Sequence, residues 1–422
     1  MPAPVLFGPA FKANPYPAYA WLREHAPAHS HTNRHGVTTW YITRYADCLN
    51  VLRDHRRFVK DYRNALSAEE RAAQPEMPPL LRLISHHILN MDAPDHTRLR
   101  TLVNDAFTVS MVERLAPRMQ VIADELLDRV AGQDQADLIE SFAFPFPIIV
   151  IAELLGVPPA DRERFRRWSS AIVAPTADIT RTLRKLEKSR PVMEDFIAYL
   201  ETICAARRAQ PRDDLISSLL AVEAAGDRLS EEELFSMVLL LIVVGHETSV
   251  NLIGNGMLAL LENPAAQEQL RDDPAILPLA VEELIRFANP VERAPMRFVA
   301  EPVTLHGRTL ARGDSVSVAL AAANRDPAQF SHPDRLDLTR EPNRHLGFGM
   351  GIHYCLGAPL ARLEGRIAFA TLLRRLPGLR LAAPAESLRW HTHPIMRGLH
   401  HLPVQWDSAE NGMESRPFLS LD

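Results

Sequence analysis

The residues best suited to chemistry lie in a short loop near the C-terminus. Glycines alternate ahead of Cys355, and another follows it, in the run from Gly347 to Gly357. Glycine allows tight backbone turns, and Pro359 suits the first turn of a helix that begins just after the cysteine. The sulfur would then meet unpaired backbone N–H groups and the positive end of a helix dipole, which favour a thiolate. A thiolate held by a stiff loop is a good axial ligand for haem iron.

Other interpretations of the cysteines are weaker. Cys48 and Cys204 lack such a loop and are expected to be buried structural cysteines, which is the usual fate of a free cysteine. Three widely spaced cysteines argue against a disulfide framework and favour a reducing compartment. No C-x-x-C-H run would attach a c-type haem, and a dinucleotide-binding G-x-G-x-x-G would need glycine in place of Ile352.

A second group of reactive residues is the Gly-His-Glu-Thr-Ser run at 245–249, which follows an apolar stretch. Glu247 and Thr248 are costly to bury there unless they have partners or a task. On a helix, Val244 and Thr248 lie one turn apart on one face, and Gly245 would leave room for a ligand. For an isolated Glu-Thr pair, the simpler interpretation is a threonine bonded to the preceding turn and a glutamate turned outward.

Two charged pairs and several histidines give weaker signals. Glu283 and Arg286 are three residues apart, which is common on helix surfaces. His96 and Arg100 are one helical turn apart, and a guanidinium fork matches a carboxylate. A zinc-protease motif at His246 fails because position 250 is valine. A further set, without a nearby carboxylate, is expected to be exposed strand histidines: His391, His393, His400 and His401.

The helix that must position the acid–alcohol pair is the best-defined element. Ser230 and Glu233 have the spacing of a capping box, and the helix can run to about Leu261, before Asn263-Pro264. Its centre is apolar on every side, which predicts a buried core helix. Further helices are expected at 14–27, 118–130, 161–168, 280–287 and 359–376, strands at 37–42, 297–305 and 315–320, and a long turn-rich segment at 324–357.

Composition limits the class of protein. The 422 residues are 46% hydrophobic and 23% charged, with a net charge of −5. These values are ordinary for a globular protein and argue weakly against a nucleic-acid binder. No signal peptide and no membrane span of about 20 apolar residues is evident, so a cytoplasmic protein is expected. We expect one domain over 1–422, with a core from Asn14 to Trp406 and a flexible tail at 407–422.

The loop as a whole resembles a known family. The stretch from Phe348 to Gly357 matches the F-G-x-G-x-H-x-C-x-G signature of cytochrome P450s at every fixed position. The following residues, 358–362, resemble the soluble bacterial branch, and most closely its macrolide- and polyketide-hydroxylating group. The resemblance spans nearly the whole chain. It implies a mainly α protein with the cytochrome P450 fold, a single large helical domain with a minor β-rich part.

The resemblance also assigns roles to individual residues. It makes Cys355 the iron ligand, and Glu247 and Thr248 the proton-delivering pair. It implies haem-binding roles for His96, Arg100, Gly245, Arg297, Phe348, Gly349, His353 and Gly357. It implies a structural triad of Glu283, Arg286 and Arg335. By alignment, the substrate pocket is expected to include Val243, Val244, Val291, Ala294, Ile395 and Met396, with a mobile cover at 58–89. Val244 departs from the family, which usually has alanine or glycine there, and a larger side chain would narrow the oxygen groove or the pocket.

The implied activity is a haem-thiolate monooxygenase of secondary metabolism. It would hydroxylate or epoxidise an apolar small molecule with O2, using haem b (iron protoporphyrin IX). No electron-transfer domain fits beside the haem domain, so a ferredoxin or flavodoxin with its NAD(P)H reductase is expected as partner. A basic face of Arg98, Arg344, Arg362 and Arg366 could receive it, and a plain solvated surface is the alternative. A peroxide-driven peroxygenase and a non-enzymatic haem-thiolate sensor are the rival functions.

Overall fold

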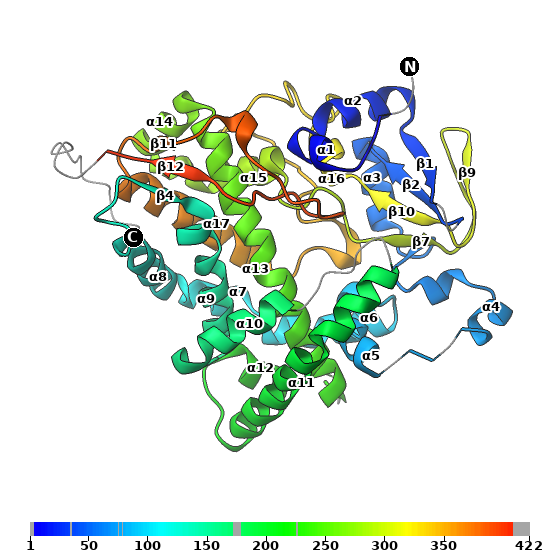
Figure 1. Cartoon of the computed structure of the whole chain (residues 1–422). Coiled ribbons are helices and arrows are strands. Elements are labelled where there is room, and N and C mark those ends of the chain that lie inside the picture. Colours follow the sequence, from blue (N-terminus) through cyan, green and yellow to red (C-terminus); the bar gives the residue numbers. More distant parts are fainter. Residues whose placement is uncertain are drawn as a thin grey trace.

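The computed structural model describes residues 4–33, 36–74, 76–77, 79–171, 179–224 and 227–407. It is mainly helical, with a smaller β-rich part at one side (Figure 1). The helices are α1 (Pro9–Ala13), α2 (Tyr16–His25), α3 (Tyr45–Arg53), α4 (Ala68–Ala72), α5 (Pro79–Ser85), α6 (Asp95–Ala106), α7 (Val109–Arg114), α8 (Ala116–Asp128), α9 (Pro145–Leu154), α10 (Arg162–Ala171), α11 (Ile179–Ala209), α12 (Leu215–Ala221), α13 (Glu231–Leu261), α14 (Pro264–Asp272), α15 (Leu277–Ala288), α16 (Leu320–Ala323) and α17 (Ala358–Arg375). The tail predicted to be flexible lies outside the described residues from 408 onward.

The strands form one larger sheet and several small ones. They are β1 (Ala28–Thr32), β2 (Thr38–Ile42), β3 (Phe58–Val59), β4 (Gln135–Asp137), β5 (Glu223–Ala224), β6 (Asp227–Arg228), β7 (Arg297–Val299), β8 (Val303–Leu305), β9 (Arg308–Leu310), β10 (Ser315–Val318), β11 (Arg380–Leu381) and β12 (Pro403–Gln405). The larger sheet has the order β1-β2-β10-β7-β3, with β10 parallel to β2 and the other pairs antiparallel. The predicted strand at 297–305 is two strands, and the one at 315–320 ends at Val318, before α16.

Helix α13 runs through the centre of the helical part, beside α15 and α17 (Figure 1). Its capping box is formed: the Ser230 side chain accepts from the Glu233 N–H, and the Glu233 side chain accepts from the Ser230 N–H. These bonds satisfy backbone donors that a helix start leaves unpaired. Among the described helices, α13 alone is long and apolar enough to cross a membrane, but 72% of its most apolar window is buried, as in a core helix. The predicted central helix is confirmed.

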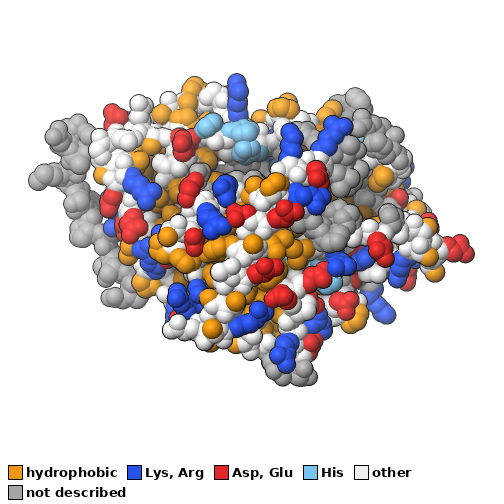
Figure 2. Space-filling model, turned by 60° about the horizontal axis from the view of Figure 1, so that its bottom comes forward, with side chains coloured by type: hydrophobic (Ala, Val, Ile, Leu, Met, Phe, Trp, Pro, Cys, Tyr) orange, Lys and Arg blue, Asp and Glu red, His pale blue; other side chains and the backbone are white. Residues whose placement is uncertain are grey.

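One face of the molecule carries interspersed acidic and basic side chains with apolar patches between them (Figure 2). Two members of the predicted basic face are already paired within the chain. Arg98 contacts Asp227 and Glu233, and Arg362 pairs with Glu282 at 2.6 Å. These ion pairs offset part of the positive charge of the predicted basic face, and its role in binding a partner stays a prediction.

Candidate active site

The cysteine loop has the stiffness that its glycines predicted. The Cys355 N–H donates to the carbonyl of Phe348 at 2.9 Å, which closes the loop just before α17. Gly349 and Gly351 have φ of +69° and +76°, in the left-handed region that glycine tolerates best. A Cβ at Gly351 would lie 2.6 Å from the carbonyl oxygen of Leu52 in α3. The loop therefore needs glycine there both for its conformation and for its contact with α3.

The surroundings of the Cys355 sulfur shift its pKa in opposite directions. Burial raises the pKa of the Cys355 thiol, while N–H groups of Gly357 and Ala358 and the Arg100 guanidinium act to lower that pKa. The helix start thus supplies the predicted stabilisation, but burial outweighs it. The N–H groups at the helix start act towards the thiolate, as predicted, and a bound metal cation would deprotonate such a thiol.

The buried imidazole of His96 lies against the half-buried imidazole of His353 in the cysteine loop. The rings of His96, in α6, and His353 have centroids 4.2 Å apart. Among the described residues, neither His96 nitrogen has a hydrogen-bond partner, nor does Nε2 of His353. Burial lowers the pKa of His96 to about 4 and that of His353 to about 2. Unpaired buried polar atoms are costly, so these nitrogens fit a site completed by a ligand.

Arg100 and Arg297 join the same group. The positive charges of Arg100 and Arg297 lower the pKa of His353, and His96 lowers it too. Arg297 begins β7 and is 4% exposed. Its side chain makes no hydrogen bond within the described part of the chain, and burial lowers its pKa to about 10. Arg100 donates from Nε to Asn104 at 3.1 Å. Guanidinium and imidazole donors around a cysteine suit a metalloporphyrin that carries two carboxylates. The donor set therefore fits haem.

Other predicted cofactor residues divide between loop and helix. The Phe348 ring lies under the Arg362 guanidinium, 4.5 Å from ring centroid to Cζ. A Cβ at Gly357 would lie 4.0 Å from the Cys355 sulfur. At Gly245, a Cβ would lie 3.2 Å from Cδ1 of Ile151 in α9. The missing side chain at 245 thus makes room for α9, and contact of Gly245 with the cofactor stays a prediction.

The acid–alcohol pair combines the two interpretations offered by the sequence. Thr248 Oγ1 donates to the carbonyl of Val244 at 2.8 Å, which is the simpler, structural bond. Burial raises the pKa of Glu247, so its carboxyl keeps a proton more readily than an exposed one. Val244, one turn before Thr248, is 37% exposed. The Thr248 hydroxyl thus lies on the same helix face as Val244. The preceding residue, Glu247, has a carboxyl that burial keeps protonated more readily.

The structure reveals a buried carboxyl that the sequence did not single out. Ser249 of α13 donates to Oε2 of Glu364 in α17, and Oε1 of Glu364 has no partner among the described residues. Burial raises the pKa of Glu364 to about 8. The two residues are 115 positions apart, and only the packing of α13 on α17 joins them. The residue that follows Thr248 therefore bonds to a carboxyl that burial keeps protonated more readily.

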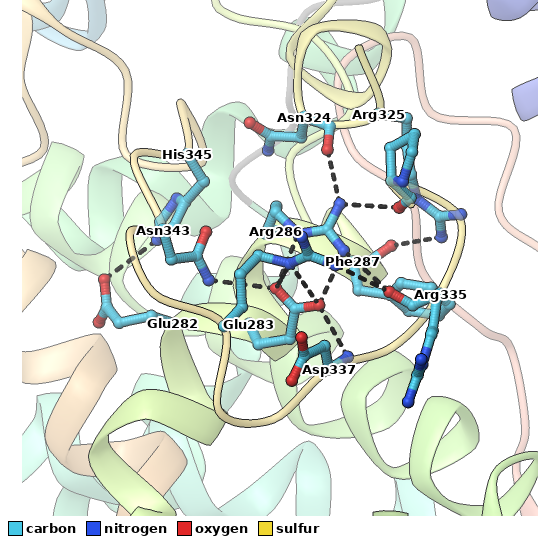
Figure 3. Close-up of polar contacts among 12 residues, drawn as sticks. Glu282, Glu283, Arg286, Phe287, Asn324, Arg325, Arg335, Asp337, Asn343 and His345 are labelled. Carbon is cyan, nitrogen blue, oxygen red and sulfur yellow. Dashed lines mark hydrogen bonds and ion pairs between the residues drawn. The ribbon is translucent and has the colours of Figure 1, made fainter. Parts of the chain in front are cut away.

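The predicted structural triad is formed with a different arginine. Glu283 is fully buried and accepts from Arg286 at 2.7 and 2.8 Å and from Arg340 Nε at 3.1 and 3.2 Å. Arg335 has an exposed side chain and contributes only its carbonyl oxygen, to Arg286 and Arg340. Figure 3 shows the Arg335 side chain turned away from the Glu283 carboxylate. Arg335 is thus corrected to Arg340 as third member, because the loop turns residue 340 inward.

Glu283 also holds the backbone that leads to the cysteine loop. It accepts from the Asp337 N–H at 3.0 Å and from Asn343 Nδ2 at 3.1 Å (Figure 3). Arg286 Nη1 donates to the carbonyls of Asn324 and Pro333. The carboxylate and its arginines therefore fix the turn-rich segment before Cys355.

Most of the predicted pocket residues come from two segments that meet. Val291 and Met396 form an antiparallel bridge, and the N–H groups of Glu292 and Arg293 donate to the carbonyl of Ile395. Ala294 is buried and donates its N–H to Val318 of β10. Val243, on α13, is half-buried. Their contact with a substrate stays a prediction.

The start of the predicted mobile cover is part of the fold. Phe58 and Val59 form β3, pair with β7 and are 3% and 6% exposed. Lys60 is buried as well. Assignment of 58–60 to a mobile cover is therefore wrong, because sheet pairing fixes their backbone.

This fold and this site define a haem-thiolate protein. Residues 165–378 match the family model of the cytochrome P450s. The chain is 46% identical over 407 residues to cytochrome P450 107B1 of Saccharopolyspora erythraea. The aligned region covers 96% of this chain and 98% of the relative. It is 42% identical to the polyketide biosynthesis cytochrome P450 PksS of Bacillus subtilis, over 94% of this chain and 97% of that one. A solved structure of PksS matches with a TM-score of 0.87 and 41% identity, covering 95% of this chain and 98% of that one.

A third relative is the mycinamicin IV hydroxylase/epoxidase of Micromonospora griseorubida, 42% identical over 92% of this chain and 94% of the relative. The chain belongs to the cytochrome P450 family. It is a haem-thiolate monooxygenase, and not a non-enzymatic sensor.

Proposed function

We propose that this monooxygenase hydroxylates or epoxidises a polyketide-derived macrocycle. The observation that carries the proposal is the similarity, over nearly the full chain, to PksS and to the mycinamicin IV hydroxylase/epoxidase. The apolar side chains expected at the pocket agree with an apolar substrate: Val243, Val244, Val291, Ala294, Ile395 and Met396. Contact with the aliphatic part of a macrocycle would remove apolar surface from water, which favours binding.

The chain's residues would divide the work as follows. Cys355 would ligate the iron, and His96, Arg100, Arg297 and His353 would bind the propionates. When bound, haem supplies O2 activation and insertion of one oxygen atom into the substrate.

Proton handling would fall to α13. Thr248 would leave the carbonyl of Val244 and donate its hydroxyl proton at the reaction site, acting as a positioned general acid. Glu247 would return the proton to Thr248, since burial raises its pKa and keeps it protonated more readily. Ser249 follows Thr248 in sequence, and its partner Glu364 on α17 would serve as a further proton store.

Electrons would come from a separate ferredoxin or flavodoxin with its NAD(P)H reductase, in the cytoplasm. Arg344 and Arg366 remain candidates for contact with an acidic partner, because no ion pair engages them within the described part of the chain. Charge complementarity of this kind mainly raises the rate of association. Raised ionic strength would then slow reduction by the partner.

The test is a binding and turnover screen with the haem-loaded protein. Macrolactones, fatty acids and terpenoids are titrated while the Soret band is followed for a spin-state change, and each binder is incubated with NADPH, ferredoxin and ferredoxin reductase. A macrolactone that shifts the band and gains one oxygen atom supports the proposal. Turnover restricted to fatty acids or terpenoids would refute the substrate class.

Use of peroxide in place of O2 is tested alongside monooxygenase turnover, because the Thr248 hydroxyl is already bonded to the carbonyl of Val244. A threonine committed to its own helix would supply protons poorly. The same substrates are therefore incubated with hydrogen peroxide alone. Faster product formation with peroxide than with the redox chain would favour the peroxygenase.

A further inference from the structure

Lys60 is a buried lysine that has no carboxylate partner. It follows β3 and is 7% exposed, and its Nζ donates to the carbonyl of Met296 at 2.7 Å. Among the described residues, no aspartate or glutamate lies within ion-pair distance of this ammonium group. Buried charges are costly unless they are paired and hydrogen-bonded. A lysine ammonium has three donors, so two remain to be satisfied.

The charges around Lys60 leave a positive excess. Arg297 lowers the pKa of Lys60 through its positive charge, and Asp92 raises it through its negative charge. The Asp92 carboxylate already accepts from the N–H groups of Lys60 and Asp61 and from Asn64. With Arg100, which acts on His96 and His353, three basic side chains face one carboxylate. Burial lowers the pKa of Lys60, and a bound anion would keep its ammonium group charged. Two positive charges remain, and a haem brings two propionates.

The position of Lys60 points to the same ligand. Met296, whose carbonyl Lys60 contacts, immediately precedes Arg297 on the way into β7. The charge of Lys60 also lowers the pKa of His353 in the cysteine loop. It acts on His87 too, a buried histidine whose Nδ1 has no partner within the described residues. Cationic and unpaired groups from several elements therefore converge here.

We propose that Lys60 is a further carboxylate-binding residue of the haem site, donating to a propionate beside His96, Arg100, Arg297 and His353. The proposal rests on the haem assignment and is independent of which substrate is oxidised. Lys60 lies on a segment fixed by the larger sheet, so its ammonium is held in place before the cofactor arrives. Such preorganisation reduces the entropy lost on binding.

The test compares Lys60→Met with a matched control, Lys12→Met, in the haem-loaded full-length protein. Lys12 is equally buried at 4% exposure, but it pairs within the chain, with Glu292 at 2.7 Å. Both substitutions replace a buried ammonium by an uncharged chain of similar length. Two quantities are measured: the rate of haem transfer to excess apomyoglobin, and the reduction potential of the iron.

Lys60→Met is expected to speed haem transfer about 10- to 100-fold, as for the loss of a charge-assisted hydrogen bond. It should also lower the reduction potential, because removing a nearby positive charge favours the ferric state. Lys12→Met should lower the urea midpoint but leave the potential unchanged. Lys60→Arg should restore most of the haem retention.

Equal haem-transfer rates for Lys60→Met and Lys12→Met, with no change in potential, would overturn the proposal. If Lys60→Met does not fold, Lys60→Gln, which keeps a polar side chain without the charge, takes its place: haem transfer faster than in Lys12→Met supports the proposal, and transfer at the rate of Lys12→Met refutes it. Neither measurement involves substrate or an electron partner. Failure here is therefore distinguishable from failure of the proposed substrate class.

Discussion

Separate substitutions of Arg340 and Arg335 should show which of these arginines stabilises the fold by binding Glu283. Arg340→Met removes two contacts of 3.1 and 3.2 Å to a carboxylate that is fully buried. Breaking a buried pair by removing one partner costs about 3–5 kcal/mol. Arg286, Asn343 and the Asp337 N–H still bind Glu283, so the cost should lie near the lower limit, about 3 kcal/mol. That corresponds to about 100-fold in the folding equilibrium.

Arg335→Met should change stability by less than about 0.5 kcal/mol, because an exposed side chain is lost and the carbonyl that accepts hydrogen bonds remains. Both variants and the parent are unfolded in urea while haem-loaded, under one set of conditions, since a bound cofactor couples to unfolding. The fraction of reduced, carbon-monoxide-treated protein with a thiolate-type Soret band is measured in parallel. Arg340→Met should lower both values. If Arg335→Met lowered them as much, the corrected triad would be wrong.

Four further substitutions test the site. Thr248→Ala should lower product formed per NAD(P)H about 10- to 100-fold while Thr248→Ser keeps it; equal yields would exclude proton delivery. Val244→Ala should raise that yield and cost less than about 1 kcal/mol of stability; an unchanged yield would mean that valine does not narrow the groove. Glu364, with a folded-state pKa of about 8 against an ordinary 4.5, releases a proton on unfolding between those values, so stability should fall as pH rises between them. In Glu364→Gln, the urea midpoint should depend less on pH over this range. If the midpoint fell with pH as in the parent, another group would cause the pH dependence. Cys355→Ala should abolish the thiolate-type Soret band of the reduced, carbon-monoxide-treated protein. A retained band would mean that another residue ligates the iron.

The fold was predictable where local signals were strong. The capping residue Ser230, the apolar centre of the following helix and the proline at 264 fix α13 to within a residue or two, because caps and periodicity act within one or two turns. The glycines around Cys355 likewise announce a tight loop, confirmed by positive φ at Gly349 and Gly351. Short strands were less predictable: β7 and β8 read as one run, since pairing partners far along the chain determine where each ends.

The candidate site was predictable as a set of residues and less so as a set of contacts. His96 and His353 are 257 positions apart in sequence, and the family signature, not any local pattern, linked them before the structure placed their rings together. Lys60 and Glu364 carry no local motif, because a lysine or glutamate is usually exposed. Their burial results from packing and was visible only in three dimensions.

By itself the sequence determined the thiolate loop, the long core helix with Glu247 and Thr248, and membership of a haem-thiolate family, because each depends on residues close together or at fixed spacing. Tertiary structure alone decided that Arg340 and not Arg335 binds Glu283, that Gly245 admits α9, and that Ser249 meets Glu364. These outcomes depend on which side of a loop or helix faces the core. Long-range packing sets that orientation, since neighbouring residues allow either side equally well.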